Sequence, residues 1–194
     1  MDYDLIVIGC SWGGLQALSR LLADVGSELP ATIVAQHRAA DGGEGLSELL
    51  RSHTELEIRD AEDKDELRPG TVYLAPPGYH LLVEDGGTLA LSTEGFVSHA
   101  RPSIDVLFES AAQAYRERCV GVVMTGASDD GARGLARIQQ LGGVVVVEDP
   151  DTAERPEMPE AAIAATKADV VLPLEEIGRF LRGLVLQTNV RTPS

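Results

Sequence analysis

The sequence is poor in cysteine and in positive charge. Cysteine occurs only at Cys10 and Cys119, both within apolar segments, which excludes a disulfide framework and indicates buried thiols in a reducing compartment. Lysine and arginine number 16 against 31 acidic residues, so the net charge is −15. Such a field repels phosphate backbones. We therefore expect no nucleic-acid partner.

Long apolar runs and metal-ligand groupings are also missing. No apolar run approaches the ~18 residues that a membrane-spanning helix needs. The first four residues are acidic at two positions, where a secretory signal would be basic. No His, Cys, Asp and Glu grouping has the spacing of a metal site. We expect a cytoplasmic protein without membrane insertion, whose chemistry needs neither a metal nor an organic cofactor.

What the sequence does contain is a repeated alternation of strand and helix patterns. This alternation predicts a doubly wound α/β fold with a mostly parallel sheet, in a single domain over residues 1–194. Two apolar runs that flank Asp85-Gly86-Gly87 predict a small antiparallel hairpin added to the sheet. We expect residues 188–194 to form a frayed tail. The expected strands are 5–8, 31–36, 56–58, 71–75, 80–83, 88–91, 119–124, 143–147 and 169–172, and the expected helices are 15–22, 46–50, 104–112, 132–141, 159–166 and 175–186.

The turn after the first strand is the most informative stretch. Residues 9–13 read G-C-S-W-G, the G-x-S-x-G pattern that places a serine hydroxyl at the tip of a sharp strand-to-helix bend. The backbone N–H of Trp12 and the positive end of the helix dipole would face an oxyanion formed on a substrate bound to Ser11. Cys10 is a poor rival nucleophile, because alternation turns its side chain away from Ser11.

Two other interpretations of this turn stay open at this point. A serine between a strand and a helix can serve only as an N-cap. A glycine-rich turn after a first strand also suggests a nucleotide site, although G-x-G-x-x-G would need glycine at position 11 and a P-loop would need a lysine that the turn lacks.

Three strand ends together supply the parts of a serine hydrolase. Ser11 follows the first strand, His37 the second, and Asp130 the strand at 119–124. A serine hydroxyl needs a base to take its proton, and the base needs a carboxylate to hold its tautomer. Right-handed crossovers bring the carboxyl ends of parallel strands to one edge. The alternatives are a merely structural His37, an Asp130 that caps the following helix, and Asp129 in place of Asp130.

The order of these residues along the chain differs from that of an α/β-hydrolase. In that fold the serine elbow follows several strands, and the triad runs Ser, Asp, His. Here the elbow follows the first strand, and the order is Ser11, His37, Asp130. The sequence therefore indicates a different fold that reaches the same geometry.

Six motifs occur in an order that resembles one known family. They are I-G-C-S-W-G-G at 8–14, Q-H at 36–37, L-A-P-P-G-Y-H at 74–80, R-P-S-I-D-V-L-F at 101–108, T-G-A-S-D-D-G-A at 125–132 and M-P at 158–159. From residue 5 to about residue 181 the chain resembles the catalytic domain of the chemotaxis protein-glutamate methylesterases, the CheB family. The resemblance implies Ser11 as nucleophile, His37 as general base and acid, Asp130 as orienting carboxylate, and an oxyanion hole from the backbone N–H groups of Trp12 and Ala127.

The resemblance also implies a reaction and a partner. Enzymes of this family hydrolyse γ-glutamyl methyl esters on the cytoplasmic domains of chemoreceptors and release methanol, and some also deamidate receptor glutamines. The implied partners are a methylated chemoreceptor and, for regulation, a separate receiver domain or chemotaxis kinase. The alternatives are an esterase or amidase for another acyl substrate and a non-catalytic chemosensory scaffold.

The sequence departs from the family pattern in ways that affect the rim of the site. The family's N-terminal phospho-receiver domain has no counterpart before the first strand, so we expect a standalone form. Trp12 stands where the family usually has threonine, Arg38 where an apolar residue is common, and Ala127 where methionine is usual. The net charge disfavours steering toward glutamate-rich receptor segments, unless Arg38, Arg101 and Arg133 form a basic patch near the site.

Overall fold

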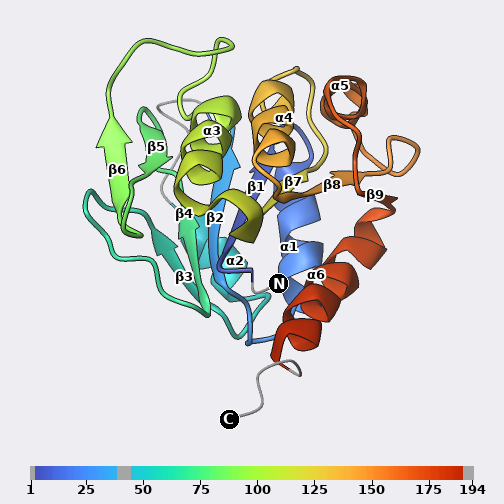
Figure 1. Ribbon diagram of the computed structural model, residues 1–194, viewed down its shortest axis with the longest axis horizontal. Coiled ribbons are helices and arrows are strands. Elements are labelled where there is room, and N and C mark those ends of the chain that lie inside the picture. Colours follow the sequence, from blue (N-terminus) through green and yellow to red (C-terminus); the bar gives the residue numbers. More distant parts are fainter. Residues whose placement is uncertain (1–2, 39–44, 190–194) are drawn as a thin grey trace.

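The computed structural model describes residues 3–38 and 45–189, which form a sheet covered by helices on both faces (Figure 1). Seven strands pair in parallel in the order β3-β4-β2-β1-β7-β8-β9. The strands are β1 (Leu5–Cys10), β2 (Ala31–Gln36), β3 (Glu57–Asp60), β4 (Thr71–Leu74), β5 (His80–Val83), β6 (Leu89–Ser92), β7 (Cys119–Val123), β8 (Val144–Glu148) and β9 (Val170–Leu172). The helices are α1 (Gly14–Asp24), α2 (Leu46–Arg51), α3 (Ile104–Tyr115), the short 3₁₀ helix η1 (Arg116–Arg118), α4 (Ala132–Gln140), α5 (Glu157–Ala165) and α6 (Leu174–Asn189). The predicted α/β fold class is confirmed.

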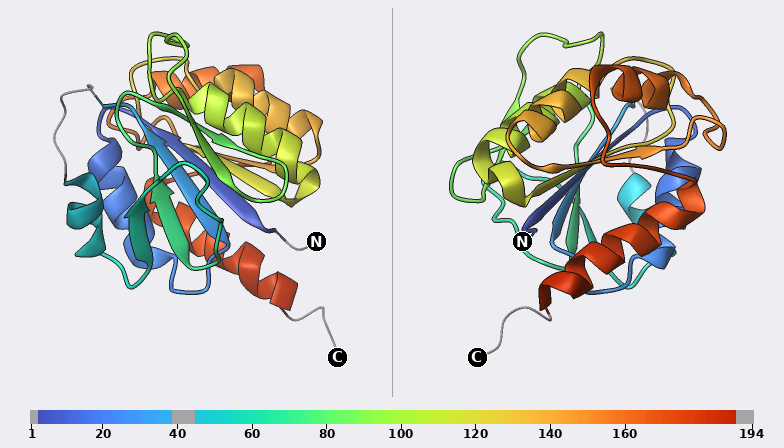
Figure 2. Two further views of the ribbon diagram at one scale, coloured as in Figure 1. Left: turned by 90° about the vertical axis from the view of Figure 1, so that its left-hand side faces the viewer. Right: turned by 45° about the vertical axis from the view of Figure 1, so that its right-hand side comes forward.

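Helices α3, α4 and α5 cover one face of the sheet, and α1, α2 and α6 cover the other (Figure 2). The strands are apolar almost throughout because both faces are buried. In β1, Leu5 and Val7 join the core under α3 and α4, while Ile6 and Ile8 join the core under α1 and α6. Alternation of side chains along the strand thus separates two apolar cores.

The strand order reverses at β1, and this reversal positions the site. The chain places β2 on one side of β1 and later returns to place β7 on the other side. In the register of these pairs Cys10 lies opposite Gln36, and Gly9 lies opposite Val123. The three strands therefore end at one edge of the sheet, where open α/β sheets hold their ligands.

Two expectations about the periphery are corrected. The hairpin of β5 and β6 forms, but as a separate two-stranded antiparallel sheet rather than as an addition to the main one. It packs against α3, where Ser110 Oγ accepts the backbone N–H of Val83 at 3.0 Å. Helix α6 continues through Asn189, so residues 188 and 189 are helical rather than frayed. Residues 190–194 of the expected tail lie outside the described residues.

Within the described ranges, no helix combines the length and the apolar character that a membrane crossing requires. Nor do the described residues contain a cluster of three or more His, Cys, Asp or Glu side chains that could hold a metal ion.

Candidate active site

The turn that carries Ser11 is fixed by its backbone. Ser11 N–H donates to the Thr125 carbonyl at 2.9 Å, and Gly14 N–H donates to the Ser11 carbonyl at 2.9 Å. Gly13 occupies the N-cap position of α1 with a φ of 77°, a left-handed conformation that favours glycine, and no side chain caps this helix end. The Ser11 hydroxyl is therefore not an N-cap. Among the described residues it has no hydrogen-bond partner, and it lines a pocket at the sheet edge.

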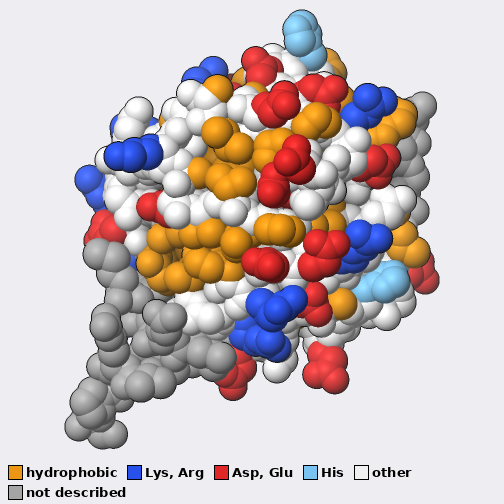
Figure 3. Space-filling view, turned by 90° about the vertical axis from the view of Figure 1, so that its right-hand side faces the viewer, with side chains coloured by type: hydrophobic (Ala, Val, Ile, Leu, Met, Phe, Trp, Pro, Cys, Tyr) orange, Lys and Arg blue, Asp and Glu red, His pale blue; other side chains and the backbone are white. Residues whose placement is uncertain are grey.

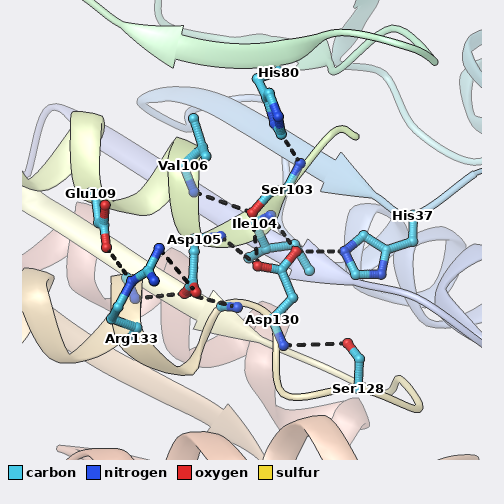
Figure 4. A network of polar contacts seen from close by, with 12 residues as sticks. His37, His80, Ser103, Ile104, Asp105, Val106, Glu109, Ser128, Asp130 and Arg133 are labelled. Carbon is cyan, nitrogen blue, oxygen red and sulfur yellow. Dashed lines mark hydrogen bonds and ion pairs between the residues drawn. The ribbon is translucent and has the colours of Figure 1, made fainter. Parts of the chain in front are cut away.

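His37 and Asp130 are brought together from opposite sides of β1. His37 Nε2 lies 2.7 Å from Asp130 Oδ2 (Figure 4), with the His37 side chain 16% exposed and the Asp130 side chain 0% exposed. The backbone N–H of His37 donates to the Cys10 carbonyl at 3.1 Å, which joins the end of β2 to the end of β1. Because a carboxylate only accepts, Nε2 carries the proton in the neutral ring, and Nδ1 is the basic nitrogen.

Ser11 and His37 line the same pocket, but no hydrogen bond joins their side chains among the residues described. Catalytic hydrogen bonds are often long in the unliganded state and shorten when substrate binds.

Asp130 is held by the start of α3. Its Oδ1 accepts from Ser103 Oγ at 2.8 Å and from Asp105 N–H at 3.0 Å, and its Oδ2 accepts from Ile104 N–H at 2.7 Å in addition to His37 (Figure 4). Burial acts to raise the pKa of Asp130, but the hydrogen bonds from His37 and from the first turn of α3 lower it by a larger amount, so the net shift of the pKa is downward. The carboxylate is thus kept ionised opposite His37.

The alternative in which Asp130 caps the helix that follows it is wrong, because α3 and α4 each donate hydrogen bonds to a carboxylate from the other side of the helix pair: Asp130, just before α4, accepts from α3, and Asp105 of α3 accepts from α4. The N-cap of α4 is Gly131, without a side-chain cap. Asp105, from the first turn of α3, accepts instead from Gly131 N–H at 3.0 Å and from Gly134 N–H at 2.7 Å at the start of α4. Burial raises the pKa of Asp105. This reciprocal arrangement fixes Asp130 relative to both helices.

Sequence reasoning gave Ser103, Asp105 and His80 no role at the site. His80 Nδ1 accepts the backbone N–H of Ser103 at 3.2 Å, and its Nε2 donates to the Gly95 carbonyl at 2.9 Å, so His80 supports the start of α3 (Figure 4). The run R-P-S-I-D at 101–105 was the available signal, because a serine before an apolar helix marks an N-cap.

Two backbone N–H groups beside Ser11 are free to bind an oxyanion. Those of Trp12 and Ala127 donate to no acceptor in the part of the chain that the structure describes. The loop that carries Ala127 lies close to Ser11: a Cβ placed on Gly126 would be 2.8 Å from Ser11 Cβ and 2.0 Å from Met158 Sδ. The Thr125 hydroxyl donates to the Trp12 carbonyl at 2.9 Å, which links the loop after β7 to the turn that carries Ser11.

The pocket beside Ser11 has a volume of about 500 Å³. Its lining residues are Ser11, His37, Arg38, Gly78, Phe96, Ser98, His99, Ala100, Arg101, Pro102, Ala127 and Ser128. Of the three arginines that could form a basic patch near the site, Arg38 and Arg101 line the pocket, whereas Arg133 does not and pairs with Glu109 at 2.6 Å. A larger hollow of about 780 Å³ lies at the amino ends of the strands and contains none of the candidate catalytic residues.

Cys10 is unsuited to act as a nucleophile. Its side chain is fully buried, and burial, aided by the charge of Glu148, strongly raises the pKa of the thiol. A thiol that stays protonated is inert.

Comparisons with known proteins agree with this geometry. The model of the family described as CheB methylesterase matches residues 6–181. A candidate protein-glutamate methylesterase/protein-glutamine glutaminase of Leptospira interrogans is 44% identical over 185 residues, which are 94% of this chain and 95% of the relative. The protein-glutamate methylesterase FrzG of Myxococcus xanthus is 39% identical over 180 residues, which are 92% of this chain and 54% of FrzG. The crystal structure of the Thermotoga maritima CheB methylesterase catalytic domain is similar with a TM-score of 0.90 at 31% identity, and the match covers 95% of this chain and 100% of that domain.

Proposed function

The chain belongs to the CheB methylesterase family, and from this premise we propose that it is a serine hydrolase that cleaves γ-glutamyl methyl esters on the cytoplasmic segments of chemoreceptors. The observation that carries the proposal is the hydrogen bond between His37, which lines the same pocket as Ser11, and the buried Asp130, with 2.7 Å between Nε2 and Oδ2. An ionised, hydrogen-bonded carboxylate behind a histidine is what an activated serine needs.

The proposed reaction begins with transfer of the Ser11 hydroxyl proton to His37 Nδ1. Ser11 Oγ attacks the ester carbonyl, and the oxyanion of the tetrahedral intermediate accepts from the N–H groups of Trp12 and Ala127. Asp130 stabilises the imidazolium. The imidazolium returns its proton to the departing methoxide, which leaves as methanol, and the glutamyl group remains on Ser11 as an ester.

Hydrolysis of this acyl-enzyme uses the same groups a second time. His37 takes a proton from water as the water oxygen attacks the acyl carbonyl. When the second intermediate collapses, the bond to Ser11 Oγ breaks, the imidazolium returns its proton to that oxygen, and a glutamate side chain is released. A glutamine side chain could follow the same route with ammonia as the leaving group. The printed name of the Leptospira relative includes this glutaminase activity, and we include receptor deamidation in the proposal.

The remaining expectations belong to the same proposal. We propose a cytoplasmic location, because the named substrate segments are cytoplasmic, and a methylated chemoreceptor as the principal partner. A separate receiver domain or a chemotaxis kinase is proposed as the regulatory partner.

Methanol release from a γ-glutamyl-methylated receptor segment tests the proposal. Ser11→Ala should lower the rate at least ~10⁴-fold, because it removes the nucleophile. Ser19→Ala is the matched control, since Ser19 lies on α1 and its hydroxyl donates to the Leu15 carbonyl, its one hydrogen-bond partner within residues 3–38 and 45–189. The proposal fails if the native chain releases no methanol or if Ser11→Ala releases it at the native rate.

A further inference from the structure

The pocket beside Ser11 differs in charge from the protein as a whole. Arg38, His99 and Arg101 line it, and none of its described lining residues is an aspartate or a glutamate, although the chain has a net charge of −15. On the face shown in Figure 3, by contrast, acidic and basic side chains are interspersed. A cationic pocket on an acidic protein concentrates anionic ligands locally, at distances within the Debye length.

Neither arginine is neutralised by a carboxylate of the described residues. Arg38 Nη2 donates to the Ala75 carbonyl at 2.9 Å, and Arg101 Nη1 donates to the carbonyls of Thr93 and Glu94 at 2.8 and 2.9 Å. Arginines elsewhere do form ion pairs, as Arg133 does with Glu109. Carbonyl oxygens orient a guanidinium but leave its full charge uncompensated.

Both guanidinium groups also keep an unsatisfied donor. The Nε atoms of Arg38 and Arg101 are buried and have no hydrogen-bond partner among the described residues. Burial lowers the pKa of Arg38, and the charge of Asp60 acts in the opposite direction. A partly desolvated guanidinium with an unused N–H donor is stabilised more by an incoming carboxylate than a fully solvated guanidinium is.

The two arginines are attached to the elements that hold the candidate catalytic residues. Arg38 directly follows His37 at the end of β2, and Arg101 lies two residues before Ser103, which donates to Asp130. The guanidinium of Arg101 also stacks on Phe96, with its carbon 4.8 Å from the ring centre, and Phe96 is 67% exposed. An anion bound here would lie within the same pocket as the scissile ester.

We propose that Arg38 and Arg101 select methyl esters that lie close to a second, free glutamate carboxylate. The inference rests on the proposed function and adds to it a substrate class: acidic segments in which the esterified glutamate has an ionised neighbour. Long-range repulsion from the whole protein slows the approach of such segments, and the local pair of cations holds them once they arrive.

Two helical peptides test this inference. Each contains one γ-methyl glutamate, and they differ only in whether the residues near it are glutamate or glutamine. The native chain should favour the glutamate peptide in kcat/KM by about tenfold, the contribution of one charge-assisted hydrogen bond. Raising the salt concentration should reduce this preference.

Arg38→Gln and Arg101→Gln should each lower the ratio of kcat/KM for the glutamate peptide to kcat/KM for the glutamine peptide. Hydrolysis of p-nitrophenyl acetate, a neutral ester, is measured for each variant so that a general loss of activity can be told apart from a loss of the preference. Arg68→Gln is the matched control, because Arg68 is 67% exposed in its side chain, pairs with Glu66 at 3.8 Å and lies outside the pocket. Equal kcat/KM for the two peptides with the native chain, at low salt, would overturn the inference. A preference for the glutamate peptide that persists when Arg38→Gln and Arg101→Gln are combined would also overturn the inference.

Failure of the proposed function gives a different result. In that case neither peptide yields methanol, although p-nitrophenyl acetate is still cleaved. The charge preference is then read from inhibition of p-nitrophenyl acetate hydrolysis by the two peptides. Stronger inhibition by the glutamate peptide, lost in Arg38→Gln and Arg101→Gln, would support the anion site, and equal inhibition would overturn it.

Discussion

Replacement of Asp130 by asparagine separates the two tasks of this side chain, which are to orient His37 and to hold the start of α3. The two carboxylate oxygens each accept one backbone N–H of α3, from Asp105 at Oδ1 and from Ile104 at Oδ2. An asparagine has one oxygen, so one of these N–H groups must face its NH₂ group, whichever way the amide points. At least one buried donor therefore loses its acceptor.

The contacts of Asp130 set the direction of both effects, and general magnitudes for such contacts set their size. Loss of one buried acceptor, together with loss of a negative charge at a helix N-terminus, should lower the free energy of unfolding by roughly 2–4 kcal/mol. The rate of ester hydrolysis should fall by about 10⁴-fold, because the amide no longer enforces the tautomer with a basic Nδ1 on His37. Urea unfolding measures the first effect, and methanol release measures the second.

Asp129→Asn is the matched control for this prediction. Asp129 is exposed, and its side chain has no hydrogen bond or ion pair among the described residues. We expect its unfolding free energy to stay within ~0.5 kcal/mol of native and its rate to change by no more than a few-fold. The reasoning is refuted if Asp130→Asn unfolds and reacts like the native chain, or if Asp129→Asn is the variant that loses activity.

Three further predictions concern the surroundings of Ser11. Gly126→Ala should abolish most ester hydrolysis and lower the free energy of unfolding by about 1–3 kcal/mol, because the added Cβ would collide with Met158 and displace Ser11. Ester hydrolysis rates and urea unfolding measure the two effects, and native activity in this variant would contradict the close packing around Gly126. Glu148→Gln should be more stable than native at neutral pH. Burial raises the pKa of Glu148, so its ionised form destabilises the fold above that pKa, and the difference in urea unfolding should shrink as the pH falls; a constant difference would contradict this. Trp12→Thr should keep the rate on p-nitrophenyl acetate within a few-fold. The Trp12 side chain is 60% exposed, and the proposed oxyanion donor is the backbone N–H of residue 12, which the substitution retains. A large fall in that rate would show that the indole itself is needed.

The sequence predicted the sheet edge well because its signals are local. Apolar runs gave the strands, and the glycine-flanked Ser11 gave the bend. The parallel crossover rule then placed His37 and Asp130 near Ser11, and the distance of 2.7 Å between His37 and Asp130 agrees with that placement. Each step depended on residues within one strand and its adjoining turn.

The contacts that the sequence did not predict join residues far apart in the chain. Asp130 caps α3, whose first residue lies 26 positions earlier, rather than the helix that follows it. Arg133 pairs with Glu109 across the helix interface instead of reaching the pocket. The turn at Asp85-Gly86-Gly87 predicted a hairpin, but whether β5 and β6 join the main sheet depends on strand order, which no local pattern encodes.

The central claim is that Ser11 is the activated nucleophile of a methylesterase, and location of a fluorophosphonate adduct by peptide mass spectrometry tests it most directly. The account predicts one equivalent of adduct on the peptide that contains Ser11, none in Ser11→Ala, and loss of methanol release in step with labelling. Methanol release that continues in fully labelled protein, or an adduct that forms on a different serine, would contradict it.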